Sequence, residues 1–203
     1  MTTTFPPSRQ PRPYPTADRW WSPPVTTAVV EALTDRELGL LRQASTDPLL
    51  TEQVLGRLWP RDRLVLPRQR MHALRPALLP SVVLTGAGAL WVHAGGTPPQ
   101  VIVVASPERC GHTPRTLTRR VRLPAVDVTD IAGQRCTTLE RTVVDLARTA
   151  PALQAVQAVL CAMARGTRRA ALLAALERCR GSCGVGRPRA RAIIHAAYDA
   201  PPA

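Results

Sequence analysis

Cysteine and histidine are the side chains of this sequence best suited to bind a metal ion or act as a base. Cys179 and Cys183 lie one helical turn apart, and His195 follows at a spacing that a metal site tolerates. A structural zinc site normally has two tight ligand pairs, and here the second pair is absent. We therefore expect no metal site, a core or capping role for His93, and free, mostly buried thiols at Cys110, Cys136, Cys161, Cys179 and Cys183.

Patterns for catalysis are weak. Cys110 and His112 would form a nucleophile and base only if Glu108 oriented them. The glycines beginning at Gly86 precede a strand, and Trp91 stands where a dinucleotide-binding fingerprint needs its third glycine. A GxxxxGK[ST] phosphate loop and a nuclease with an essential lysine are excluded because the sequence contains no lysine. We therefore expect a non-enzymatic protein with no catalytic residue and no cofactor.

Arginine supplies all of the formal positive charge. The 203 residues include 27 Lys+Arg against 14 Asp+Glu, which gives a net charge of +13, and none of the 27 is lysine. Asparagine is absent too, as is typical of a very GC-rich coding sequence, so part of the arginine excess follows from codon usage. The remaining excess favours a partner rich in phosphate, such as DNA. The alternative is a solvated basic face without a ligand.

Two groups of arginines are placed to contact DNA phosphates. One group lies in the N-terminal helical region and the other on and just beyond a predicted central strand. Contacts to phosphates position a protein on the duplex but do not read its sequence. The predicted DNA-binding residues are Arg57, Arg61, Arg63, Arg119, Arg120 and Arg122.

The N-terminal residues 1–27 contain seven prolines and few apolar side chains, so we expect a disordered arm. This start is polar instead of signal-like, and the chain has no run of about 18 apolar residues. A cytoplasmic protein without a membrane segment is therefore expected. Thr34 and Glu37 have the spacing of a capping box, which predicts a short helix.

A second N-terminal helix is predicted to begin at Asp47-Pro48 and to end at Pro60. Its apolar face comprises Leu50, Val54, Leu55, Leu58 and Trp59. Residues 64–66 predict a brief strand. Two short helices and a strand are typical of a small winged helix-turn-helix. We therefore assign residues 28–70 to a helix-turn-helix-like region, which is degenerate in this chain.

The central residues 71–150 predict a small antiparallel or mixed sheet. Residues 81–94 suit a buried helix that the following glycines end. The β-branched run 101–104 predicts a buried strand, and residues 115–122 alternate with the period of a half-exposed strand. Short strands are expected on either side of Gly133.

The remaining sequence predicts helices. A second capping box at residues 137–140 begins one helix, and Pro151, Thr167 and Pro188 each mark the start of another. Residues 151–203 form the C-terminal helical segment in this interpretation. The predicted fold class is therefore α+β, with a small sheet wrapped by helices.

Three blocks within residues 83–148 carry a family resemblance. The first is LTGAGALW at residues 84–91, a helix of small residues that ends in an aromatic residue. The second is the valine-rich strand at residues 99–107, which is followed by an arginine-rich loop at residues 109–122. The third and most specific is RCTTLERTVVDLA at residues 135–147, which is similar to the signature "pVTsperTllDLa". Together they resemble the AbiEi family of antitoxins from type IV toxin-antitoxin systems, especially its actinobacterial members.

The resemblance implies that Thr137, Arg141, Thr142 and Asp145 are family signature residues. Arg141 and Asp145 are four residues apart, so they can pair on one helix face, and we interpret the signature as structural. The resemblance also implies a winged helix-turn-helix that binds promoter DNA and a nucleotidyltransferase-type toxin as the cognate partner. Many relatives continue into an endonuclease-like domain, which is not expected here.

The sequence thus predicts a non-enzymatic antitoxin and transcriptional regulator that binds DNA. Two alternatives from other classes stay open. One is a degenerate protein-interaction module, and the other is an accessory remnant of a nuclease-type system, in both cases without DNA specificity of its own.

Overall fold

The computed structural model describes residues 34–36, 51–107 and 115–200. The predicted proline-rich arm lies outside these residues, as do Cys110, His112 and the predicted helix start at Asp47-Pro48. Of the helix predicted after Thr34, only Asp35 and Arg36 are described, and both are helical.

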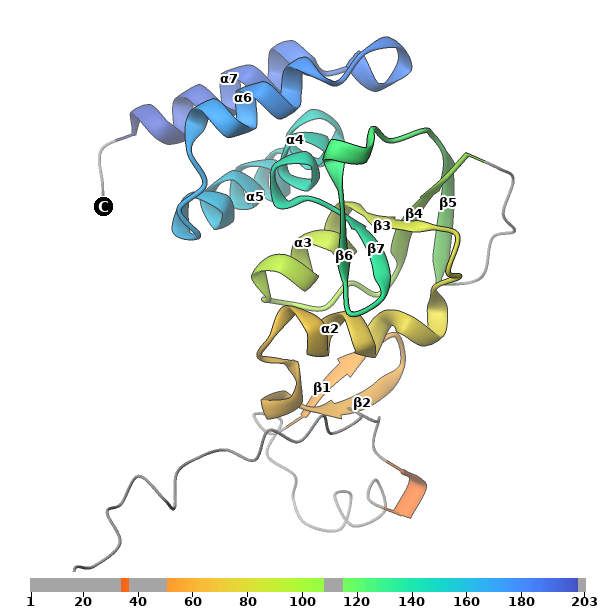
Figure 1. Ribbon diagram of the computed structural model, residues 1–203. Helices are drawn as coiled ribbons and strands as arrows, with labels where there is room; N and C mark the ends of the chain where they lie inside the picture. Colours follow the sequence, from red (N-terminus) through yellow and green to blue (C-terminus); the bar gives the residue numbers. More distant parts are fainter. Residues whose placement is uncertain (1–33, 37–50, 108–114, 201–203) are drawn as a thin grey trace, which may run out of the picture.

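A five-stranded mixed sheet forms the centre of the molecule (Figure 1), in the order β5-β4-β3-β7-β6. Strand β3 is in the middle, where it pairs antiparallel with β4 and parallel with β7. The pair β4 and β5 is parallel, and the pair β6 and β7 is antiparallel. The strands are β3 (Val83–Thr85), β4 (Ile102–Ser106), β5 (Thr116–Arg120), β6 (Val128–Ile131) and β7 (Gln134–Thr137).

Helices pack around this sheet in two groups. Two helices and the sheet enclose one apolar core, and four C-terminal helices enclose a second. Figure 1 shows α6 and α7 at the end of the molecule opposite the N-terminal hairpin. The helices are α2 (Pro67–Leu74), α3 (Gly86–Ala94), α4 (Leu139–Thr149), α5 (Ala152–Ala164), α6 (Arg169–Glu177) and α7 (Arg187–Asp199). The predicted α+β class, a sheet wrapped by helices, is confirmed.

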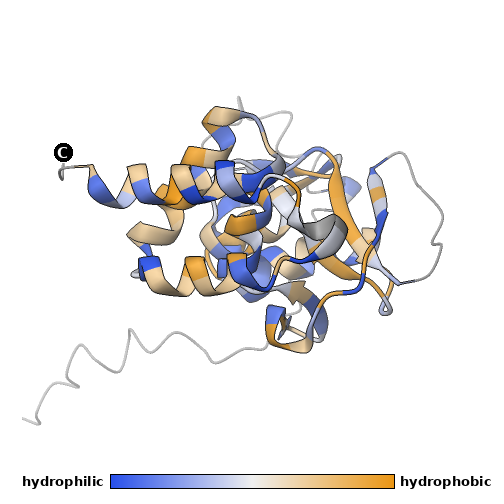
Figure 2. Ribbon diagram, turned by 90° about the horizontal axis from the view of Figure 1, so that it is seen from above, coloured by the Kyte–Doolittle hydropathy of each residue, from blue (hydrophilic) through white to orange (hydrophobic). Residues whose placement is uncertain are grey.

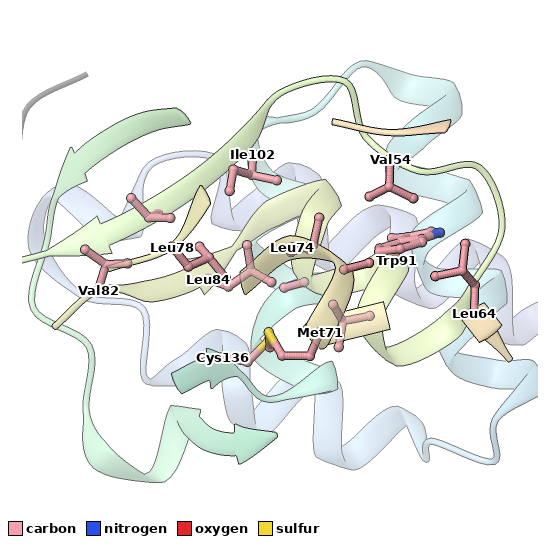
Figure 3. Close-up of a cluster of buried hydrophobic side chains, with 14 of the residues drawn as sticks. Val54, Leu64, Met71, Leu74, Leu78, Val82, Leu84, Trp91, Ile102 and Cys136 are labelled. Carbon is pink, nitrogen blue, oxygen red and sulfur yellow. The ribbon is translucent and has the colours of Figure 1, made fainter. Parts of the chain in front are cut away.

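The first core lies between α2, α3 and the sheet (Figure 3). Met71 and Leu74 of α2 meet Trp91 of α3, and Leu84 and Ile102 contribute from the strands. The second core joins α4 to α5, α6 and α7. Figure 2 shows hydrophilic and apolar residues interleaved along the helices, as expected of helices with one buried face.

The helix predicted between Asp47-Pro48 and Pro60 is wrong over its described part. Residues 51–60 form a two-stranded antiparallel hairpin, with β1 (Thr51–Val54) paired to β2 (Arg57–Pro60). The turn between them has positive φ at Leu55 (49°) and Gly56 (82°), a geometry that suits a two-residue hairpin loop. Val54 and Trp59 are buried on the inner face of the hairpin. The spacing of apolar residues that predicted a helix is therefore also compatible with a hairpin.

Two further element assignments need correction. The strand predicted at residues 64–66 is absent, because the short 3-10 helix η2 (Arg61–Leu64) ends there and leads into α2. The single helix predicted at residues 81–94 is a strand followed by a helix, β3 and α3. Gly86, with φ +62°, is the residue at which the chain changes from one to the other.

Predicted helices in the C-terminal half are present, with shifted N-caps. The N-cap of α4 is Thr138, not Thr137, and its side chain accepts a hydrogen bond from the Arg141 backbone N–H. The helix predicted to start with a Thr167 cap begins one residue later, with Arg168 at the cap position. In α5 the buried residues are Ala155, Ala158, Val159 and Ala162.

Candidate functional site

A cleft of about 490 Å³ opens over one face of the β5-β4-β3 half of the sheet. Val103 and Ala105 of β4 form its floor, and the N-terminal end of α3 forms one wall. Residues of α4 and the start of α5 form the opposite wall. Its described lining includes four arginines, Arg119, Arg120, Arg141 and Arg148, and one carboxylate, that of Asp145.

Strand β5 brings two of the predicted DNA-binding residues to this cleft. Arg119 and Arg120 are exposed side chains at the end of β5, and Arg122 is exposed just beyond it. No carboxylate or carbonyl of the described chain accepts a hydrogen bond from any of these three guanidinium groups. Because β5 is an edge strand of the sheet, its arginines are accessible to a large partner as well as to a small ligand.

The α3 end that faces the cleft has no side-chain cap. Its N-cap residue is Thr85, whose hydroxyl donates to the Val103 carbonyl at 3.0 Å instead of accepting from the first turn. The first N–H groups of a helix have no partner within the helix, and they carry the positive end of its dipole. Gly86 and Ala87, which line the cleft, belong to this first turn.

A chain of alternating charges fixes the opposite wall. Asp127 is fully buried and accepts from Arg178 at 2.8 Å and from Arg141 at 2.9 Å. Arg141 Nε also donates to Asp145 at 2.8 Å, and Arg148 donates to the other oxygen of Asp145 at 2.7 Å. Both carboxylates are therefore shared between two arginines. The contacts of Asp127 hold α4 against the turn before β6 and against the end of α6, while those of Asp145 lie within α4.

The pKa of Arg141 reflects this position. Burial disfavours its charged form, but hydrogen bonds to Asp145 and Asp127 and the charge of Asp145 outweigh burial and raise the pKa. A buried arginine with two carboxylate partners keeps its charge. The Arg141 Nε and NH1 groups are engaged with Asp145 and Asp127 within the protein. The predicted pairing of Arg141 with Asp145 on one helix face is confirmed.

The other signature residues connect α4 to the central strand. The hydroxyls of Thr137 and Thr142 are 2.7 Å apart, and Thr137 donates to the Leu84 carbonyl at 3.3 Å. Both threonines are fully buried. Contacts of this kind support the interpretation of the signature as structural.

The remaining predicted DNA-binding residues lie on the N-terminal hairpin and the turn that follows. Arg57 is exposed on β2, and Arg61 and Arg63 are exposed on η2. Arg61 is engaged in an ion pair with Glu52 at 3.1 Å, which leaves its charge partly compensated. The structure does not bring these three arginines into the cleft with Arg119 and Arg120.

Arg115 connects the two groups. Its guanidinium lies against the hairpin turn, because a Cβ atom added to Gly56 would be 2.0 Å from Arg115 NH1. Arg115 directly precedes β5, so the hairpin turn is next to the start of the strand whose other end carries Arg119 and Arg120. The sequence alone could not place Arg115 at a hairpin, because residues 51–60 were predicted as part of a helix.

Arg70 stabilises the fold through buried hydrogen bonds, and the residues around it in the sequence do not predict this role. Its side chain is buried and donates to the Val92 carbonyl at 3.0 Å, to Leu64 at 3.0 Å and to Val65 at 2.6 Å. It therefore satisfies carbonyls at the C-terminal end of α3, where a cation is favourable. The buried Asp127 was missed too, and its only signal is a single acid within an apolar stretch of residues 125–128.

His93 is half-buried and has a hydrogen-bond partner in the Thr137 carbonyl, as expected of a histidine in a structural role. Its Nε2 lies 2.7 Å from the Thr137 carbonyl, so this nitrogen carries the proton of the neutral ring. Burial lowers the pKa of His93, and the hydrogen bond to Thr137 offsets only part of that effect.

The thiols fit the prediction where they are described. Cys136 and Cys179 are buried and free, and Cys161 is half-buried and free. Burial raises the pKa of Cys136 to about 12, which keeps it protonated and unreactive. In the described part of the chain, no group of three or more His, Cys, Asp or Glu side chains is arranged to hold a metal ion.

Comparisons with known proteins give no relative for this chain. No family model matches it, and no curated protein or solved structure is significantly similar to it. Within the described residues, no helix is both long and apolar enough to cross a lipid bilayer.

Proposed function

We propose that this protein is a non-enzymatic DNA-binding regulator of the AbiEi antitoxin type. The observation that carries the proposal is the pair Arg119 and Arg120 on the edge strand β5, which find no acceptor in the described part of the chain, with Arg115 joining this strand to the N-terminal hairpin. An edge strand can approach a duplex without obstruction from a neighbouring strand. A guanidinium group without a protein acceptor can donate two parallel hydrogen bonds to the oxygens of one phosphate.

The dimensions of this surface suit a duplex. If the chain stays extended, residues Arg115 to Arg122 span roughly 23 Å at about 3.3 Å per residue step. This length corresponds to the rise of about seven base pairs at about 3.4 Å each. Several phosphates therefore lie within reach of one strand edge.

The hairpin supports the same proposal. A winged helix-turn-helix presents a two-stranded hairpin to DNA beside its recognition helix, and β1–β2 is a hairpin that carries an exposed arginine, Arg57, directly after its turn. In this proposal Arg57, Arg61 and Arg63 contact phosphates from the hairpin side, while Arg119, Arg120 and Arg122 contact them from the sheet.

As an antitoxin of this type, the protein counteracts a nucleotidyltransferase-type toxin encoded beside it. Regulation of their shared promoter is the activity that the arginine surface supports directly. The signature residues Thr137, Arg141, Thr142 and Asp145 take part through the fold, because their side chains bind one another and neighbouring elements.

A second candidate function, a protein-interaction module, is favoured by the outer face of α5. Leu153, Val156 and Leu160 are spaced along one side of this helix and are 79%, 39% and 50% exposed. Exposed apolar residues at helical spacing are a common feature of contact surfaces.

Fluorescence anisotropy with the duplex upstream of the protein's own gene tests the proposal. A scrambled duplex of equal length and composition is the control, and both are titrated at about 0.15 M salt. The proposed function predicts tighter binding to the upstream duplex by about tenfold or more. Equal affinity for both duplexes, or no binding to either, would reject regulation and leave the interaction module as the function.

A further inference from the structure

We propose that the cleft beside β5 binds a small organic phosphate, with the phosphate group at the N-terminal end of α3 and an aliphatic body along the floor of the sheet. The phosphate would receive hydrogen bonds from the first-turn N–H groups of α3 and from Arg119 and Arg120. The body would pack on Val103 and Ala105.

The polar end of the cleft has donors without acceptors. The Thr85 hydroxyl donates its hydrogen bond to the Val103 carbonyl and does not cap the first turn of α3. Arg119 and Arg120 also lack acceptors within the described chain. A phosphate group carries enough oxygens to accept from both arginines and from the helix at once.

The charge of the cleft is positive after internal pairing. Among the described residues that line it, Asp145 is the one carboxylate, and Arg141 and Arg148 each donate to one of its oxygens. Arg141 also binds Asp127, which is buried behind the wall. The paired arginines are held in place by these contacts, while Arg119 and Arg120 remain available to the ligand.

The size and lining of the cleft indicate more than a bare phosphate ion. A volume of about 490 Å³ falls within the range of ligand pockets for small organic molecules, roughly 300–1,000 Å³. Val121, Leu123 and Leu146 extend the apolar surface begun by the strand floor. Among the described residues that line the cleft, none is aromatic, so a stacked nucleobase is not favoured and an aliphatic body is.

A regulatory consequence rests on the proposed function. Arg119 and Arg120 belong both to the cleft and to the DNA-binding surface, so a bound organic phosphate would compete with DNA for the same guanidinium groups. Arg122 is on the DNA surface but does not line the cleft. Ligand binding is measured without DNA. Failure of the ligand proposal is therefore distinguishable from failure of the proposed DNA binding.

Isothermal titration calorimetry with the full chain tests the site. The probes are hexyl phosphate, inorganic phosphate and 1-hexanol. The expected order is hexyl phosphate tightest, inorganic phosphate weaker by about tenfold, and no binding of 1-hexanol, because the cleft offers both an anion site and an apolar floor. Absence of hexyl phosphate binding, or equal binding of hexyl and inorganic phosphate, would overturn the proposed ligand class.

Two variants locate the binding. Ala87→Glu places a carboxylate in the exposed first turn of α3, where an acid stabilises a helix, so this variant should fold and lose hexyl phosphate affinity by about tenfold or more. Arg119→Gln combined with Arg120→Gln should lose a similar factor. Arg135→Gln is the control, because Arg135 is an exposed arginine on β7, away from the cleft.

The control should bind within about twofold of the wild type, since most exposed substitutions away from a site have small effects. A thermal melt of each variant confirms that it is folded. If Ala87→Glu is folded and binds hexyl phosphate as tightly as the wild type, the α3 terminus is not the phosphate site and the proposal is wrong. Equal losses in all variants, including Arg135→Gln, would show only a general charge effect and would reject it as well.

Discussion

Arg141 on α4 donates a 2.9 Å hydrogen bond to Asp127, a fully buried aspartate in the 3-10 turn η4 (Ala125–Asp127) that precedes β6. Arg178 reaches the same carboxylate from the end of α6. The carboxylate thus ties the C-terminal helices to the edge of the sheet. This arrangement gives a physical reason for an arginine at position 141, which the family resemblance alone does not supply.

Replacement of Asp127 by Asn should destabilise the protein strongly. Arg141 would lose one of its two carboxylate partners while staying buried, and breaking a buried pair from one side costs about 3–5 kcal/mol. Urea unfolding monitored by circular dichroism measures the change. Asp62→Asn, at an exposed aspartate of η2, is the control and should alter the free energy of unfolding by less than about 0.5 kcal/mol. A similar small change for Asp127→Asn would show that the buried pair contributes little.

Gly56→Ala tests the hairpin against the helix that the apolar pattern predicts. In the hairpin Gly56 has φ +82°, and an alanine there is strained by about 1 kcal/mol or more, with Arg115 displaced in addition. In a helix the same substitution would stabilise by about 1 kcal/mol. The sign of the change in unfolding free energy therefore decides between them, and a stabilised variant would contradict the hairpin.

His93 should make stability depend on pH. Burial lowers its pKa below the ordinary value of about 6.5, so on acidification the unfolded chain binds a proton before the folded one does. The contribution to folding is complete above pH about 6.5 and falls as the pH decreases toward the lowered pKa.

Urea unfolding of the wild type and His93→Gln at pH about 7.5 and about 5.5 measures this contribution. Other titrating groups affect both proteins, so the difference between the two pH-induced changes reports on residue 93. The wild type should lose more stability on acidification than the variant, whose amide can still donate to Thr137. Equal losses would mean that His93 is protonated as easily in the folded state as in the unfolded one.

Much of the fold follows from local signals in the sequence. The β-branched run before Pro107, the alternation along residues 115–122 and the capping-box pattern at residues 137–140 each predict an element that is present, although the cap of α4 is Thr138. These signals are local because strand pleating and helix capping depend on neighbouring residues.

The wrong predictions of secondary structure arise where one pattern of apolar residues is compatible with two structures. Val54 and Leu58 are spaced for a helix, but Gly56 between them has a positive φ and makes a turn. The three residues of β3 continue directly into α3, so no polar break separates strand from helix, and Gly86 is the only local sign of the change.

The candidate site could be predicted only in part. Arg119 and Arg120 were identified because arginines cluster on one predicted strand, and both side chains are exposed. The cleft depends on the approach of α3, α4 and β5, which are far apart in the sequence, and on the register of β4 with β5. Tertiary contacts of this kind leave no pattern in a single sequence, so the partners of Asp127 and the carbonyls around Arg70 could not be foreseen.

The salt dependence of DNA binding tests the central claim, that the arginines of the β5 edge contact phosphates, most directly. Anisotropy titrations with the upstream duplex give log K against log salt for the wild type, for the combined Arg119→Gln, Arg120→Gln and Arg122→Gln variant, and for Arg135→Gln as control. Each lost phosphate contact should reduce the slope by about 0.9, so the triple variant should differ from the wild type by close to 3. The control should differ by no more than about 0.3. A triple variant with the slope and affinity of the wild type would contradict a phosphate-binding role for this strand.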